Sequence, residues 1–234
     1  MTDLDLLILT VYIITVVYVL YQAINTLDDQ TTFHFDRNEL DRVLEEKELK
    51  DLINLNFRFE DRYKFEEQPR KLSLSLENKS TDRSFEVDWD HSSLTDFEGR
   101  SRRAIRLTPD KRFNLPGYLA FSTVPPGKTL KEDFTAEDTL KMNIDGSLES
   151  ASPIIDILGI EAGSKKPNKR GEQLKKLYAN FMERKEDLRF SARIIVKMTD
   201  LVDGGKGDRP YVLPCNFVIK KVPWSDALPF NPKK

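Results

Sequence analysis

Hydrophobic and polar residues change their spacing twice along this chain. Residues 4–24 are almost uniformly apolar, and their single charge, Asp5, lies at the outer edge of the run. A helix needs roughly 20 largely apolar residues to cross the ~30 Å hydrocarbon core of a bilayer. The chain beyond this run is polar and has the short amphipathic segments of a globular domain. The first run therefore predicts a transmembrane anchor over residues 1–27.

Two alternatives for this run fit the sequence less well. A cleaved signal peptide has a basic n-region and a small-residue cleavage site, whereas MTDLD carries two acids and no base. A buried core helix is rarely apolar on all faces. The first basic residues, Arg37 and Arg42, follow the span, so the positive-inside rule favours a cytoplasmic location for the large domain. Plasma and thylakoid-type membranes are not distinguished by these features.

Residues 28–54 are predicted to form a polar linker and then a juxtamembrane helix. The helical part has two groups of apolar residues at helical spacing, which slip relative to each other: Leu40, Val43 and Leu44, then Leu49, Leu52 and Ile53.

From residue 55 onward the apolar residues alternate with polar ones, which is typical of half-buried antiparallel strands. Leu72, Leu74 and Leu76 alternate in this way, and FSARIIVKMTD and YVLPCNFVIKKV repeat the pattern near the end of the chain. Short strands separated by Gly and Pro turns predict a mainly β fold, an immunoglobulin-like antiparallel β-sandwich over residues 55–223. Residues 224–234 are predicted to be an irregular tail.

One segment, at about residues 168–186, returns to helical spacing. Its apolar residues recur at i, i+3, i+4, i+7 and i+8, as in an amphipathic helix: Leu174, Leu177, Tyr178, Phe181 and Met182. The basic residues in and around it form a candidate interaction surface: Lys165, Lys166, Lys169, Arg170, Lys175, Lys176, Arg184 and Lys185. The simplest interpretation is a solvated basic face. The functional alternative is docking to anionic headgroups or to an acidic partner, since a basic residue near an anionic leaflet contributes about 1 kcal/mol.

Composition limits the remaining possibilities. The 37 basic and 39 acidic residues give a net charge of −2, so no general attraction to nucleic acid is expected. Cys215 is the single cysteine and is predicted to be a small buried residue. Asp88, Asp90 and His91, with Asp96 nearby, are the densest candidate for a hard-cation site, although such acids also start turns at strand ends.

No sequence motif indicates catalysis. The run DGGKGD at residues 203–208 lacks the GxxxxGK[ST] frame of a phosphate-binding loop and is predicted to be a turn between strands. No nucleophile elbow is present. We therefore predict a protein that is not an enzyme and needs no cofactor or metal.

Turn motifs between residues 72 and 140 carry a resemblance to a known kind of module. The segment has Asn78-Lys79-Ser80, a strand ending in Trp89-Asp90, and a Pro-Pro-Gly turn at residues 125–127. In these features it resembles a β-sandwich module of uncharacterised bacterial envelope and membrane-anchored proteins. The resemblance implies a fold and carries no activity or site residues with it.

The functional prediction is a non-enzymatic, single-pass membrane protein that acts as a subunit, assembly factor or scaffold of a larger membrane protein complex. Its expected partners are the lipid bilayer and other membrane proteins, and not nucleic acid. Tyr12, Thr15 and Tyr18 are candidate interface residues within the span, because hydroxyl groups hydrogen-bond across helices in lipid. The alternatives are a membrane-tethered sandwich that binds a lipid or small ligand, and a hydrolase with unrecognised residues.

Overall fold

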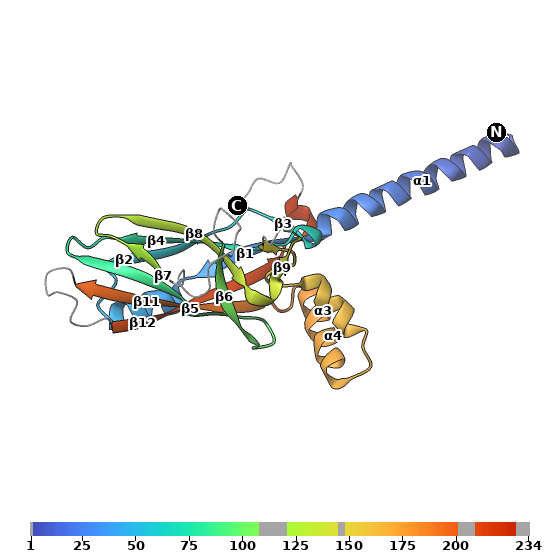
Figure 1. Ribbon diagram of the computed structural model, residues 1–234. Coiled ribbons are helices and arrows are strands. Elements are labelled where there is room, and N and C mark those ends of the chain that lie inside the picture. Colours follow the sequence, from blue (N-terminus) through green and yellow to red (C-terminus); the bar gives the residue numbers. More distant parts are fainter. Residues whose placement is uncertain (1, 108–120, 145–147, 201–208, 228–234) are drawn as a thin grey trace.

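The computed structural model describes residues 2–107, 121–144, 148–200 and 209–227 (Figure 1). The α-helices in these residues are α1 (Asp3–Asp28), α2 (Asn38–Glu46), α3 (Ile157–Ser164) and α4 (Lys169–Met182). The strands are β1 (Gln30–Asp36), β2 (Ile53–Arg58), β3 (Tyr63–Lys64), β4 (Leu72–Asn78), β5 (Arg83–Thr95), β6 (Ser101–Leu107), β7 (Phe121–Val124), β8 (Thr129–Ala136), β9 (Leu140–Met142), β10 (Leu148–Ser150), β11 (Leu188–Asp200) and β12 (Arg209–Lys221). Three 3-10 turns complete the set: η1 (Phe65–Glu67), η2 (Glu137–Thr139) and η3 (Trp224–Ala227).

Helix α1 projects from the rest of the molecule as a single long rod (Figure 1). Thr2 and Asp5 close its first turn, since each accepts a hydrogen bond from the other's backbone N–H. Its segment Asp3–Ala23 has a mean hydropathy of 2.2, and none of it is buried against the protein. By length and composition this helix meets the requirement for a membrane span, which a signal sequence also meets.

Ten of the strands form one curled antiparallel sheet in the order β2-β4-β8-β6-β5-β11-β12-β1-β3, with β7 paired to β5, and β9 and β10 form a separate two-stranded sheet. The prediction of a mainly β fold is confirmed. The halves of the sheet are joined through β6, which pairs with β5 at residues 101–103 and with β8 at residues 104–107. The sheet is therefore a half-barrel, and the immunoglobulin-like arrangement of two separate sheets is not confirmed.

Aromatic rings fill the interior of the half-barrel. Phe217 stacks on Phe190 with ring centres 4.6 Å apart and meets Phe57 edge-on at 4.8 Å. Phe35 packs against Phe57 at 4.9 Å. Such contacts supply most of the free energy that holds the sheet closed, because each buried ring removes a large apolar area from water.

Residues 30–36, predicted to be part of a linker, are instead strand β1. This strand pairs with β12 from Thr31↔Lys221 to Asp36↔Asn216. A single residue, Asp29, separates it from α1. The linker prediction was wrong because the alternation of Thr31, Phe33 and Phe35 sits in a run that is otherwise polar.

The predicted juxtamembrane helix is shorter than expected. Helix α2 ends at Glu46, and β2 already begins at Ile53. Leu40, Leu44 and Leu49 are all buried in the same core. The slip between the two apolar groups therefore marks a change from helix to strand and not a kink.

The predicted amphipathic helix is confirmed as α4, and α3, which was not predicted, precedes it to form a helical hairpin. The two helices approach closely: a Cβ on Gly163 would lie 2.6 Å from Cδ1 of Leu174. Figure 1 shows the hairpin at the end of the half-barrel from which α1 leaves. In the predicted irregular tail, η3 forms at Trp224–Ala227. The DGGKGD run lies outside the described residues.

Candidate functional site

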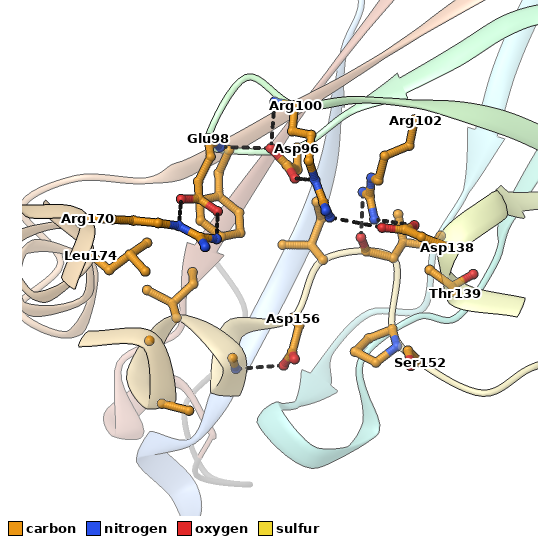
Figure 2. Close-up of a pocket in the computed structure, with 18 of the residues that line it drawn as sticks. Asp96, Glu98, Arg100, Arg102, Asp138, Thr139, Ser152, Asp156, Arg170 and Leu174 are labelled. Carbon is orange, nitrogen blue, oxygen red and sulfur yellow. Dashed lines mark hydrogen bonds and ion pairs between the residues drawn. The ribbon is translucent and has the colours of Figure 1, made fainter. Parts of the chain in front are cut away.

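A cleft of about 430 Å³ lies between the helical hairpin and the sheet. Its walls are the β5–β6 turn, η2, the loop at residues 152–156, α3, and the start of α4 (Figure 2). Cavities of this size suit a small ligand or the side chains of a partner.

The β5–β6 turn is held rigid by its first residue. Oδ1 of Asp96 accepts hydrogen bonds from the backbone N–H groups of Glu98 at 3.0 Å and Arg100 at 2.9 Å. Gly99, with φ of +80°, occupies the left-handed conformation that a side chain would strain. The turn therefore presents Glu98 and Arg100 to the cleft in fixed positions.

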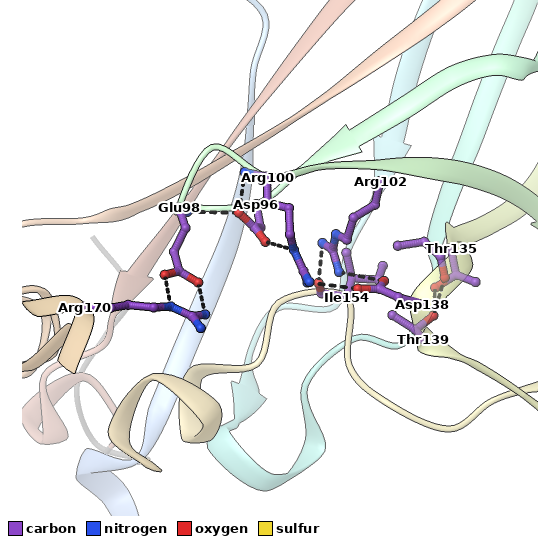
Figure 3. A network of polar contacts seen from close by, with 10 residues as sticks. Asp96, Glu98, Arg100, Arg102, Thr135, Asp138, Thr139, Ile154 and Arg170 are labelled. Atoms are coloured by element: carbon purple, nitrogen blue, oxygen red, sulfur yellow. Dashed lines mark hydrogen bonds and ion pairs between the residues drawn. The ribbon is translucent and has the colours of Figure 1, made fainter. Parts of the chain in front are cut away.

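Three arginines and four acids line the cleft. Figure 3 shows the network that the arginines form with three of these acids, Asp96, Glu98 and Asp138. Arg170 of α4 forms a two-pronged pair with Glu98, at 2.8 and 2.7 Å, and the hydrogen bonds to Glu98 raise the pKa of Arg170. Arg100 donates to Asp138 at 2.9 Å. The first pair joins the hairpin to the β5–β6 turn across the mouth of the cleft.

Arg102 is the most buried of these arginines, with 9% of its side chain exposed. Its guanidinium donates to Asp138 at 3.2 Å and to the carbonyl of Ile154 at 2.8 Å. Its Nε has no hydrogen-bond partner among the described residues. A buried donor without a partner costs about 1–3 kcal/mol, and because this Nε is itself inaccessible, the cost lies inside the wall of the cleft and not at its surface.

The other side of the cleft is apolar. Ile154, Ile155 and Ile160 are buried there, and Leu174 closes the floor from α4. The loop that carries the isoleucines is fixed from below, because Ile157 N–H donates to Oε1 of Gln68 at 3.0 Å. Asp96, Glu98 and Asp138 are bound by guanidinium groups, and Asp156 accepts from the backbone N–H of Gly159. The cleft is therefore arranged for recognition, with an apolar floor beside a rim of both charge signs.

The structure separates the predicted basic residues into three groups. Arg170 and Lys166 line the cleft. Lys169, Lys175 and Lys176 are exposed on α4. The others have local partners: Lys165 with Glu161, Lys185 with Glu183, and Arg184 with the carbonyl of Val222.

The candidate residues in α1 are exposed along the helix and lie apart from the cleft (Figure 1). The Thr15 hydroxyl donates to the carbonyl of Val11 at 2.8 Å, so its proton is already used within the helix. The Tyr18 hydroxyl accepts from the amide of Gln22 at 2.9 Å. Tyr12 is 66% exposed.

The acidic candidates for a cation site are engaged elsewhere. Asp88 is 1% exposed, lies 3.0 Å from Nζ of Lys197 and bonds Nδ1 of His91 at 2.9 Å. Asp90 pairs with Arg103. Among the described residues no cluster of three or more His, Cys, Asp or Glu side chains is placed to hold a metal ion.

Regular strand alternation would place Asp88 and Asp90 together on the outward face of β5, but β5 bulges there and Asp88 is buried. The pairing with β11 shifts between Arg193↔Ser93 and Ile195↔Asp88, so the alternation of faces fails. Burial raises the pKa of the Asp88 carboxyl, but hydrogen bonds from Lys197 and His91 outweigh it and hold that pKa below its ordinary value. Cys215 is fully buried, as predicted, and burial raises the pKa of its thiol.

Four polar residues of the cleft were not predicted as site residues: Glu98, Arg100, Arg102 and Asp138. The sequence EGRSR at residues 98–102 contains both signs of charge around a turn glycine. That pattern indicates a turn, and nothing in it indicates that a helix 70 residues later supplies the facing wall.

No family model and no curated protein matches this chain. Two solved structures resemble it weakly. A protein described as ApaA from Bordetella pertussis is 11% identical, with a TM-score of 0.30, over 73% of this chain and 92% of that one. A FixG-related protein from Vibrio parahaemolyticus is 14% identical, with a TM-score of 0.22, over 83% of this chain and 99% of that one. Similarity at this level assigns neither a fold nor a function.

Proposed function

We propose that this chain is a non-enzymatic, single-pass membrane protein that acts as a subunit, assembly factor or scaffold of a larger membrane protein complex. The observation that carries the proposal is the connection between α1 and the sheet. Only Asp29 separates α1 from β1, and its carbonyl accepts a hydrogen bond from Phe65 N–H at 3.1 Å. The apolar, exposed helix is thus joined to the folded domain by a connection of one residue. Such a short connection favours a protein whose domain is held in a fixed position at a membrane.

The cleft is the proposed recognition site for the partner. Its rim offers paired charges of both signs, and its floor offers buried isoleucines. A partner loop with one apolar side chain and flanking polar groups suits both parts, since interfaces combine an apolar centre with a polar rim.

Three finer points belong to this proposal. The large domain lies on the cytoplasmic side, because Arg37 and Arg42 follow the span. A distant relationship of the sheet to immunoglobulin-like sandwiches is part of the proposal, and its antiparallel strands support it. The turn motifs at residues 78–80 and 125–127 support a relationship to bacterial envelope-anchored modules.

A second candidate is the binding of a small ligand. The aromatic rings of Phe57, Phe190 and Phe217 fill the part of the half-barrel where an internal ligand would lie. The cleft is the better location, and it suits an amphipathic molecule with an apolar part and an acceptor group facing Arg102.

Replacement of two alanines by tryptophan, one inside the cleft and one outside it, tests the recognition site. Ala162 lines the cleft, whereas Ala179 is exposed on α4 outside it. Tagged full-length protein, A162W and A179W are purified from native membranes in mild detergent. We expect subunits that co-purify with the parent and with A179W to be lost from A162W. Equal recovery with A162W, or a monomer in every case, contradicts the proposal. A retained small molecule in native mass spectra favours the second candidate.

A further inference from the structure

The depth of the domain relative to the bilayer follows from α1. Its apolar span is Asp3–Ala23, and five more helical residues follow. At 1.5 Å per residue these add about 8 Å. The polar headgroup layer on each side of a bilayer is roughly 5–8 Å thick. With α1 in a membrane, Asp29 therefore lies at the level of the headgroups.

A chain of contacts holds helix α4 at nearly the same level. Phe65 donates its backbone N–H to the carbonyl of Asp29, and its ring lies 6.3 Å from that of Phe181 in α4. Figure 1 shows the hairpin extending sideways from the α1 axis and not along it.

The solvent side of this hairpin is basic. Three exposed lysines of α4 lie outside the cleft and have no ion-pair partner among the described residues: Lys169, Lys175 and Lys176. Glu172 is the one acid of α4 exposed among them, since α4 ends at Met182. The local excess is about two positive charges on a surface that the fold holds beside the membrane.

We propose that the α3–α4 hairpin binds the anionic phospholipid headgroups of the leaflet into which α1 inserts, through Lys169, Lys175 and Lys176. The inference rests on the membrane-spanning role of α1 in the proposed function and goes beyond it by giving the hairpin a lipid ligand. The hairpin is then a second attachment point that fixes the rotation of the domain about α1, leaving the cleft on its other side available to a partner.

Lipid is the occupant that the geometry favours over an acidic protein. The headgroups are already within reach once α1 is inserted, so no second molecule has to be recruited. Attraction to an anionic leaflet contributes about 1 kcal/mol for each lysine near it, equivalent to a roughly fivefold change in the ratio of docked to undocked hairpin.

A fluorophore on α4 measures this contact directly. Ala179 is exposed on α4, so A179C provides a labelling site, while Cys215 is fully buried and stays unlabelled. The labelled full-length protein is placed in nanodiscs of phosphatidylcholine, or of phosphatidylcholine with phosphatidylglycerol, each containing headgroup-labelled nitroxide lipid. We expect roughly twofold stronger quenching in the anionic nanodiscs, returning to the neutral value in high salt.

Two matched charge-reversal variants complete the test. K169E/K175E/K176E is expected to lose the anionic-lipid effect. K79E/K128E/K131E changes three exposed lysines at the β4–β5 and β7–β8 turns and on β8, and is expected to retain the effect. Circular dichroism confirms that both variants are folded.

The possible failures are distinguishable. Equal quenching in both lipid mixtures, or an equal loss in both variants, overturns the lipid proposal alone. Protein that does not insert into nanodiscs overturns the membrane anchor and with it the proposed function. If quenching in anionic nanodiscs equals that in neutral nanodiscs, and the hairpin variant also loses a co-purifying subunit, the lysines are assigned to an acidic protein partner.

Discussion

Asp88 shows how one buried carboxylate stabilises an irregular strand. It lies at the bulge of β5 and bonds Lys197 and His91, while Lys197 also lies 4.4 Å from the centre of the Phe121 ring. Asp88→Asn removes the charge but keeps the shape, so we expect a loss of about 1–3 kcal/mol in the free energy of unfolding. Urea denaturation in detergent measures it. Asp90→Asn, at an exposed pair with Arg103, serves as the control and should change stability by less than about 1 kcal/mol.

The same carboxylate gives a pH dependence with a definite sign. The pKa of Asp88 in the folded state is below its ordinary value of 3.8. Its contribution is therefore complete above that ordinary value and is lost as the pH falls through the folded-state pKa. The difference in stability between the parent and Asp88→Asn should be constant from about pH 7 to pH 5 and shrink below about pH 4. A difference that grows in acid would show that Asp88 is not stabilised as an anion.

Glu98 and Arg170 form the contact between the hairpin and the β5–β6 turn. Arg170 is 68% exposed, so we expect Glu98→Gln to change overall stability by less than about 1 kcal/mol. The effect should be local: amide hydrogen exchange should rise in α3 and α4 and stay unchanged in β11 and β12. The swap E98R/R170E restores opposite charges and should restore the slow exchange. Unchanged exchange in Glu98→Gln would mean that the apolar floor alone holds the hairpin.

At the scale of single elements, the hairpin depends on a close backbone approach. A Cβ on Gly171 would lie 2.0 Å from the carbonyl oxygen of Lys166. Gly171→Ala must therefore displace the loop between α3 and α4, and we expect a loss of about 1–3 kcal/mol.

Gly163→Ala is the matched comparison for this prediction. There the close atom is the end of the Leu174 side chain, 2.6 Å away, which can rotate. Because that side chain can rotate, we expect Gly163→Ala to lose less of the free energy of unfolding than Gly171→Ala. Thermal unfolding of both variants measures the two losses, and a larger loss for Gly163→Ala would contradict the close approach at Gly171.

The elements that the sequence predicts well are those whose apolar spacing is regular and long. Helix α1, helix α4, and strands β4, β11 and β12 all have this property. Strand β1 is missed because its place in the sheet comes from pairing with β12, more than 170 residues later. Helix α3 is missed because PIIDILGIEAGS has no clear period.

The candidate site illustrates the same limit. The lysines of the hairpin are visible as a cluster in the sequence. The cleft is not visible, since it joins the turn at Asp96–Arg100, Asp138 of η2, the isoleucine loop and α4 only in the folded chain. Each part reads locally as an ordinary turn or helix end, and the arginine network exists only after the sheet has curled.

At the scale of the whole molecule, the short connection between α1 and β1 positions every other surface. We expect that insertion of a flexible six-residue Gly/Ser linker between Asp29 and Gln30 leaves the sheet folded but frees the domain from the membrane surface. The quenching of the α4 label by headgroup nitroxides should then fall toward background in neutral lipid. Unchanged quenching after the insertion would show that the hairpin binds lipid without help from the anchor connection.

The antiparallel pairing of β1 with β12 also determines how the protein bears load. A force between the bilayer and a partner bound to the domain enters through α1 and runs along β1. The hydrogen bonds between β1 and β12 extend from Thr31↔Lys221 to Asp36↔Asn216. A force along β1 shears these hydrogen bonds, so that they carry the load together and do not open one after another. Strand β1, predicted from the sequence to be part of a linker, is therefore the element that resists a pulling force between α1 and the rest of the domain.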